Sequence, residues 1–260
     1  MKTNQPSITP AGHTAARRSK FAALAALAVL VPVMSASRTH AQASQPSASV
    51  GWLSASPTVV QAGTKPKLEW GITYPATVKD HVEIEGKGTV KAKKKLTVNV
   101  RVLGAGVTVS NSDGSYMAFV RTKGSISYNG GSWTTIFDGK NPDVRPDRIV
   151  YNATVDKDKS LRFGGRYYYN SNWSEFLYSN MGNNNVRALA NGDTPPTAYP
   201  MHTAPTLEEF IRPYLDGEGR VKIGPMDIIV LMELTHRDSQ ANQLGYDLQD
   251  LVLLVTFKEI

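Results

Sequence analysis

Apolar and polar residues alternate with a period of two over much of the first half of the chain. Residues 67–74, 81–85 and 96–102 show the alternation most plainly, with apolar side chains at every second position. This period predicts strands with one face on a core and the other in water. Similar short stretches, separated by turn residues, predict further strands at 115–121, 125–128, 133–137, 148–155 and 160–169.

Two nearly continuous apolar runs lie late in the sequence, at residues 228–234 and 251–255. Runs without alternating polar positions are typical of strands that are buried on both faces. Two strands form no stable core alone. We therefore expect both runs to join the sheets that the earlier strands build.

The stretch 170–225 carries little strand signal and is predicted to be an insertion. Within it, residues 173–178 are predicted to form one or two helical turns with Asn172 as the N-cap. A second short helix is predicted to begin at Thr206, because Glu209 stands where a capping box requires it.

Many short strands with regular turns predict an all-β protein, an antiparallel β-sandwich. We expect one sandwich domain over residues 57–260, interrupted by the insertion at about 170–225. Residues 44–56, rich in Ser, Ala, Gln and Pro, are predicted to be a linker or a leading edge strand. The chain has no Cys, so no disulfide supports the predicted fold.

The first predicted strands resemble the opening of bacterial immunoglobulin-like modules. The stretch Pro57-Thr-Val-Val-Gln-Ala-Gly63, followed by Leu68-Glu-Trp70, matches their Pro-x-x-Val start, turn glycine and Leu-x-Trp strand. The resemblance covers about 15 residues and implies an immunoglobulin-like sandwich. The Cys pair and the Tyr-x-Cys corner of true immunoglobulin domains are absent.

The N-terminus has the order of a secretory signal peptide. A basic cluster at 17–20 precedes an uncharged apolar stretch at 21–33, and Ala41-Gln-Ala43 follows as a small-x-small cleavage site. We predict that residues 1–43 are removed and that the protein is exported, to the periplasm, the cell surface or the extracellular medium. Retention as a membrane anchor is the alternative, and the Sec and twin-arginine routes both stay open.

The predicted cleavage changes the charge balance. Five of the 29 basic residues and none of the 22 acidic ones lie in residues 1–43, so the remainder has a net charge of +2. This balance removes the case for a nucleic-acid partner. Residues 44–205 carry 19 basic and 12 acidic residues, whereas residues 206–260 carry 5 and 10. The two parts either face each other within one fold or steer self-association between copies.

The sequence contains no motif of nucleophilic or metal-dependent catalysis. A Gly-x-Ser-x-Gly elbow and a His-Glu-x-x-His pair are both absent, and thiolate chemistry requires the Cys that the chain lacks. Oxygen ligands alternate at Asp156, Asp158 and Ser160, but without the glycine and glutamate of a calcium loop, so a solvated turn is favoured. We expect no metal site, no cofactor and no transmembrane segment after cleavage.

Paired carboxylates are the one catalytic device that the pattern leaves open. Glu233 lies inside an apolar run, where an unpaired charge would be costly. If the two apolar runs pair as a hairpin, Glu233 falls near Asp250. The pair would then act as a glycosidase pair, or serve structure through a salt bridge or exposure at an edge.

Aromatic residues cluster just before the predicted insertion. The candidate ligand-binding residues are Tyr167, Tyr169, Trp173 and Tyr178, followed by a loop rich in Asn. Aromatic faces beside amide side chains suit sugar rings. The structural alternative is a hydrophobic cluster that pins the insertion to the sheet.

Two classes of function follow from these patterns. The favoured one is an exported, non-enzymatic envelope or extracellular protein with a structural or interaction role. The alternative is a carbohydrate-binding module or glycoside hydrolase that uses the 167–178 aromatic cluster. The expected partners are a second copy of the chain or a cell-envelope polysaccharide.

Overall fold

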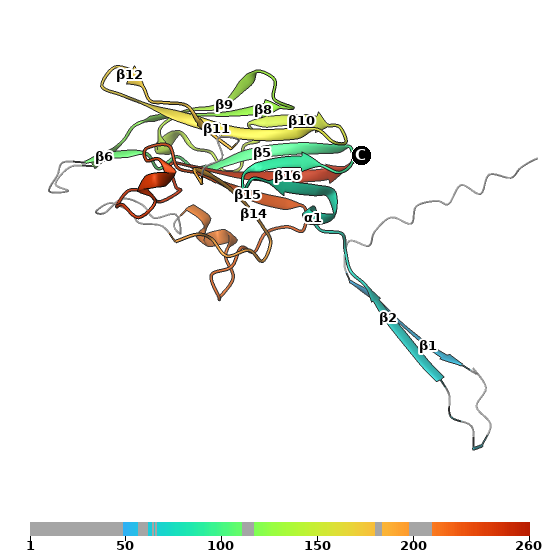
Figure 1. Ribbon diagram of the computed structural model, residues 1–260. Helices are drawn as coiled ribbons and strands as arrows, with labels where there is room; N and C mark the ends of the chain where they lie inside the picture. Colours follow the sequence, from blue (N-terminus) through green and yellow to red (C-terminus); the bar gives the residue numbers. More distant parts are fainter. Residues whose placement is uncertain are drawn as a thin grey trace, which may run out of the picture. The chain divides into compact units, whose positions relative to one another are not determined.

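The computed structural model in Figure 1 describes residues 49–56, 62–63, 65, 67–110, 117–179, 184–197 and 210–260. The predicted signal peptide at 1–43 lies outside the described residues. So does the predicted capping box at Thr206. Residues Ser44–Ile260 form one compact unit.

One of the two large sheets has five strands, all antiparallel to their neighbours. In spatial order they are β10 (Tyr151–Val155), β5 (Leu96–Gly104), β16 (Leu251–Glu259), β15 (Asp227–Met232) and β14 (Val186–Ala190). The hairpin of β15 and β16 joins the two apolar runs, as their pattern predicted.

The other large sheet follows the order β3, β4, β11, β8, β9, with β12 and β13 also paired to β11. Their bounds are β3 (Val82–Glu85), β4 (Thr89–Ala92), β8 (Arg121–Tyr128), β9 (Trp133–Gly139), β11 (Ser160–Tyr169), β12 (Asn172–Trp173) and β13 (Leu177–Tyr178). In Figure 1, β8, β9 and β11 form a layer against β5, β15 and β16.

The two sheets enclose a common apolar core. Val98, Val230 and Leu253 from the five-stranded sheet and Ile126 and Phe163 from the other sheet belong to the same buried cluster. Burial of apolar surface stabilises a fold by about 25 cal/mol per Å², and it is the main stabilising force in a domain that has no disulfides. The arrangement confirms the predicted all-β, antiparallel sandwich.

A pair of glycines lets the sheets approach closely. Gly124 of β8 and Gly165 of β11 are directly opposite each other. A Cβ atom at Gly124 would overlap the side chain of Leu251, and one at Gly165 would lie 3.0 Å from Leu234 Cδ1. Both positions therefore exclude larger residues.

A second apolar cluster covers the other face of the five-stranded sheet. Ile229, Leu231 and Val252 point to that face, where Ile211 and Val221 pack against them. Strands β15 and β16 are thus covered on both faces, which explains why their sequences lack polar alternation. The prediction of strands buried on both faces is confirmed.

Smaller elements complete the described chain. The short hairpin of β6 (Thr108–Ser110) and β7 (Met117–Phe119) is separate from the large sheets, and so is that of β1 (Val50–Ser56) and β2 (Lys67–Thr73). The helical elements are α1 (Val78–His81) and the 3₁₀ turns η1 (Asn141–Asp143), η2 (Arg212–Tyr214) and η3 (Asp238–Gln240).

The predicted helical turns at 173–178 are wrong. Asn172 and Trp173 form β12, and Leu177 with Tyr178 forms β13, both paired to β11. Asn170 and Ser171 have φ values of 48° and 64°, so they make a two-residue turn that reverses the chain. Hydrogen bonding to an open strand edge outweighs the weak helical signal of so short a stretch.

The segment 170–225 also contributes strands to both sheets. Besides β12 and β13, it contains β14, which pairs with β15 along the edge of the five-stranded sheet. The described parts of this segment are therefore built into the sandwich. Its strands are short, which is why alternation was hard to detect.

Candidate functional site

The outer face of the seven-stranded sheet carries a row of polar and charged side chains. Ile126 of β8 and Phe163 of β11 point into the core. The residues at odd positions of β8 and at even positions of β11 therefore point outward. The outward residues of β8 include Arg121, Lys123 and Ser125. Strand β11 places Arg166 directly opposite Lys123.

Aromatic side chains from neighbouring strands lie on the same face. Trp133 of β9 meets Phe176 edge-on, with ring centroids 4.8 Å apart, and Tyr178 at 5.6 Å. Phe176 and Tyr178 stack with centroids 6.1 Å apart. These geometries are the favoured ones for aromatic pairs.

We name this surface the aromatic–basic face; it comprises Arg121, Lys123, Ser125, Trp133, Thr135, Arg166, Trp173, Phe176 and Tyr178. A pocket of about 290 Å³ opens on it. The residues that line the pocket are Lys123, Ser125, Trp133, Thr135, Arg166 and Phe176. The pocket thus combines two cations, two hydroxyls and two aromatic rings in a volume close to that of small ligand sites.

Three cations surround the indole of Trp173. Lys123 Nζ lies 4.6 Å from the ring centroid, and the guanidinium carbons of Arg166 and Arg121 lie at 4.8 Å and 5.4 Å. Each such contact is worth about 0.5–1 kcal/mol at an exposed site. Trp173 therefore holds three positively charged groups close together beside the pocket.

One carboxylate partly balances this charge. Asp138 of β9 accepts hydrogen bonds from Arg121 Nε and Nη2, and Lys123 Nζ lies 3.2 Å from its Oδ2. The Arg121 guanidinium holds the pKa of Asp138 below its usual range. Among the described residues, Arg166 has no carboxylate partner, and its guanidinium lies over the Trp173 ring.

The structure separates the four aromatic residues predicted from the sequence. Trp173 and Tyr178 lie on the aromatic–basic face. Tyr167 packs against the core, and its burial raises the pKa of its hydroxyl. Tyr169 is exposed, but it lies on the same side of β11 as Tyr167 by strand alternation.

Of the residues that line the pocket, only Phe176 lies in the 167–178 aromatic cluster predicted from the sequence. Trp133 comes from β9, far in sequence from the predicted cluster, and Lys123 comes from β8. The available signal was the charge at 121 and at 166 on the predicted strands 115–121 and 160–169, together with Trp133 on the predicted strand 133–137. Lys123 falls in the predicted break between 121 and 125, where the structure instead has the continuous strand β8. Only the pairing order of the strands brings these residues together.

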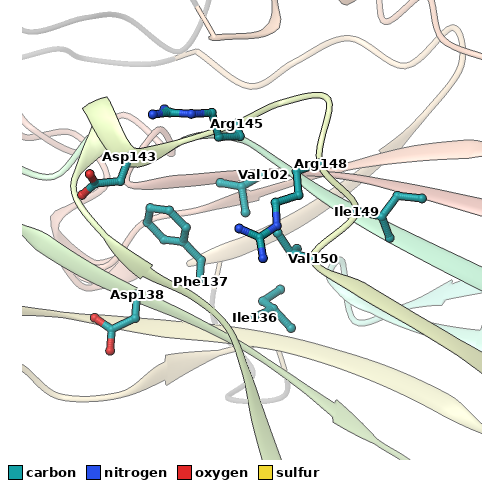
Figure 2. A pocket seen from close by; sticks show the side chains of 9 residues that line it. All are labelled: Val102, Ile136, Phe137, Asp138, Asp143, Arg145, Arg148, Ile149 and Val150. Carbon is teal, nitrogen blue, oxygen red and sulfur yellow. The ribbon is translucent and has the colours of Figure 1, made fainter.

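A second pocket, of about 280 Å³, lies at the edge of the sandwich (Figure 2). Its lining includes Arg145 and Arg148 from the loop after η1, Asp138 and Asp143, and the apolar residues Val102, Ile136, Phe137, Ile149 and Val150. Arg145 Nη1 donates to the carbonyl oxygens of Pro142 and Val144. Asp143 Oδ2 accepts the Lys140 amide at 2.8 Å. Most charges at this pocket are therefore engaged within the protein.

The structure also brings Glu233 and Asp250 together, as the hairpin pattern predicted. Both are buried. The Thr235 amide donates to Glu233 Oε1 and to Asp250 Oδ2, each at 3.0 Å, and the Leu234 amide donates to Asp250 Oδ2 at 2.6 Å.

Further donors saturate Glu233. Its Oε1 accepts the Thr235 hydroxyl at 2.6 Å and the His236 amide at 3.0 Å. Its Oε2 accepts the amides of Asp247 and Leu248 at 3.0 Å and 3.2 Å. Leu248 has a φ of 56°, a left-handed conformation that its amide contact with Glu233 helps to hold.

The three neighbouring carboxyl groups titrate differently. Burial and the charge of Glu233 raise the pKa of Asp247 to about 8 and that of Asp250 well above its usual range. Burial also acts to raise the pKa of Glu233, but hydrogen bonds from His236, Thr235 and Asp250 hold it below its usual value. Of the three coupled carboxyl groups, Glu233 is therefore the one that ionises first as the pH rises.

This geometry suits structure better than glycoside hydrolysis. A glycosidase pair stands about 5 Å or more apart, with room for a sugar between the carboxyl groups. Here the Thr235 amide donates to both carboxyl groups, and the adjoining cavity holds about 80 Å³. The carboxylates instead tie the connection between β15 and β16. Within the described residues, no three acidic or histidine side chains form a group fit to hold a metal ion.

The fold and the site define an antiparallel sandwich with one aromatic–basic surface. Comparison of the chain with protein-family models, with curated proteins and with solved structures finds no match. In the part of the chain that the structure describes, no helix combines the length and apolar character needed to cross a bilayer.

Proposed function

We propose that this is an exported, non-enzymatic interaction protein that binds a cell-envelope polysaccharide through the aromatic–basic face. The observation that carries the proposal is the pocket between Trp133 and Phe176, flanked by the hydroxyl residues Ser125 and Thr135. Sugar rings present apolar faces to aromatic side chains and hydroxyls to polar ones. Trp133 is 37% exposed and available for such stacking.

Two further features support a binding role over a catalytic one. The predicted signal peptide would deliver the protein to the compartment where envelope polysaccharides are found. Paired carboxylates were the catalytic device that the sequence left open, and both oxygen atoms of Glu233 already accept hydrogen bonds from neighbouring residues. The face itself holds cations, rings and hydroxyls.

The proposal is tested by the binding of purified polysaccharides to wild type and to Trp133→Ala. Loss of one stacking ring is expected to weaken binding about tenfold, equivalent to about 1.4 kcal/mol. Isothermal titration measures the change, with Trp52→Ala as the matched control. Trp52 is an exposed indole on β1, a strand that contributes no residue to the face. Equal binding by the two variants, or no binding by the wild type, would refute the proposal.

Self-association is a second candidate function, favoured by the hairpin of β1 and β2. Leu53 is paired with Trp70, Ala55 with Leu68 and Gly51 with Ile72, so one face of the hairpin is apolar. Leu53 and Trp70 are each 71% exposed. An isolated two-stranded hairpin is only marginally stable in water.

A second copy of the same hairpin is the occupant that this face fits. Identical apolar faces are self-complementary about a two-fold axis. Sedimentation velocity over a range of concentrations should show association that Trp70→Ser weakens. Trp52→Ser, on the opposite face of the same hairpin, is the control. Apolar contact predicts that added salt leaves association intact, whereas association through the opposite charges of residues 44–205 and 206–260 would weaken.

A further inference from the structure

Resting on the proposed polysaccharide binding, we propose that the pocket of the aromatic–basic face takes an acidic sugar, whose oxyanion lies between Lys123 and Arg166. This assignment names the class of ligand that the face selects. Three observations support it: Lys123 and Arg166 are paired across the sheet, both contact the ring of Trp173, and one carboxylate faces the cations around them.

The two cations are direct neighbours across the sheet. Arg166 of β11 and Lys123 of β8 are paired in register. Side chains at such positions have Cβ atoms about 5 Å apart, and like charges placed there repel each other. An oxyanion between them would turn this repulsion into two attractive contacts, because a guanidinium and an ammonium both donate to carboxylate or sulfate oxygens.

Trp173 holds both cations in place for such a ligand. Lys123 Nζ and the Arg166 guanidinium lie at 4.6 Å and 4.8 Å from the indole centroid. The ring attracts the cations without providing hydrogen-bond acceptors, so the contact with Trp173 occupies none of their N–H groups. Lys123 directs part of its ammonium group to Asp138, and its other N–H groups can still donate to a ligand. A carboxylate in place of Trp173 would have neutralised the site.

The surrounding charges leave the pocket positive. Among the described residues, Asp138 is the carboxylate that pairs with cations of this face, and Arg121 engages both of its oxygens. It also lies 3.2 Å from Lys123 Nζ. One carboxylate thus serves two cations, and Arg166 is left without an acidic partner among the described residues.

The remaining pocket walls fit the body of a sugar. Trp133 and Phe176 meet at 4.8 Å in an edge-on arrangement and form the aromatic wall. Ser125 of β8 and Thr135 of β9 are register partners and add hydroxyl groups. The pocket therefore runs from a cationic end to an aromatic end, which matches an acidic monosaccharide unit in a chain.

The test compares three polymers on the full chain. Polygalacturonate carries carboxylates, dextran sulfate carries sulfates and dextran is neutral. The wild type is expected to bind at least one anionic polymer about tenfold or more tightly than dextran. Arg166→Gln is expected to remove this preference for anionic polymers over dextran. Arg148→Gln has the same change in charge on an exposed loop residue and serves as the control.

The outcomes separate this inference from the proposed function. Binding of dextran as tight as that of both anionic polymers would overturn the acidic ligand and leave polysaccharide binding standing. Absence of binding to all three polymers would overturn both. Equal losses in Arg166→Gln and Arg148→Gln would show a general charge effect and overturn the site. Preference for polygalacturonate or for dextran sulfate identifies the oxyanion. Thermal unfolding of each variant checks that it is folded.

Discussion

Glu233 shows how this protein accommodates a charge in an apolar strand. An unpaired buried carboxylate is costly, but here five N–H and O–H donors surround it. The sequence placed Glu233 near Asp250 on the condition that the two apolar runs pair as a hairpin, which they do. It did not predict Asp247 or the backbone donors. The backbone donors are positioned by loop dihedral angles, such as the positive φ of Leu248, which the residue pattern does not predict.

Asp247 should make stability depend on pH. Its pKa is about 8 in the folded protein and close to 4 when unfolded. The folded state therefore binds the extra proton, so this contribution is present below about pH 4 and is lost as the pH rises toward 8. Glu233, with its lowered pKa, acts in the opposite sense at lower pH.

The expected result is a free energy of unfolding that falls as the pH rises between about 4 and 8. Asp247→Asn should make that fall shallower. A smaller dependence on pH should remain, because the pKa of Asp250 is also raised. Urea unfolding at several pH values measures the slope. Asp158→Asn, in an exposed turn with a φ of 63°, is the control. Identical slopes for wild type and Asp247→Asn would contradict the assigned pKa.

The strands were predictable where one or both of their faces meet the core. Strands β5, β11, β15 and β16 follow clear period-two or continuous apolar patterns. Strands β12 and β13 have two residues each, too few for any period to appear. Their extended conformation depends on pairing with the edge of β11. Because that pairing cannot be detected in the local sequence, the local pattern predicted a helical turn instead.

The contact between β8 and β16 depends on the absence of a side chain at Gly124. Gly124→Ala should lower the free energy of unfolding by about 1–3 kcal/mol, because its Cβ would overlap Leu251. Urea unfolding is the measurement. Gly217→Ala, which meets no atom within 4 Å, is the matched control. Adding Leu251→Ala to Gly124→Ala should relieve the overlap, and a purely additive loss would contradict this account.

The sandwich was predictable from the sequence, but its strand order was not. Alternation shows which residues of a strand face a core, and it does not show which strands are neighbours. The aromatic–basic face depends on that order, because β8, β9, β11 and β12 each contribute to it. Trp173 and Tyr178 were candidates because they lie in one aromatic cluster of the sequence. Trp133, Lys123 and Arg166 were not, because only the strand order brings them to the same face.

The strand order has a consequence for the route by which the chain folds. Strand β5, which ends at Gly104, has β16 as a neighbour, and β16 begins only at Leu251. Pairing of strands so distant in sequence closes a long loop, and such topologies fold slowly. The five-stranded sheet cannot close until residues beyond 250 are free of the ribosome or a translocation channel. This delay is compatible with passage through a membrane as an extended chain, and folding on the far side.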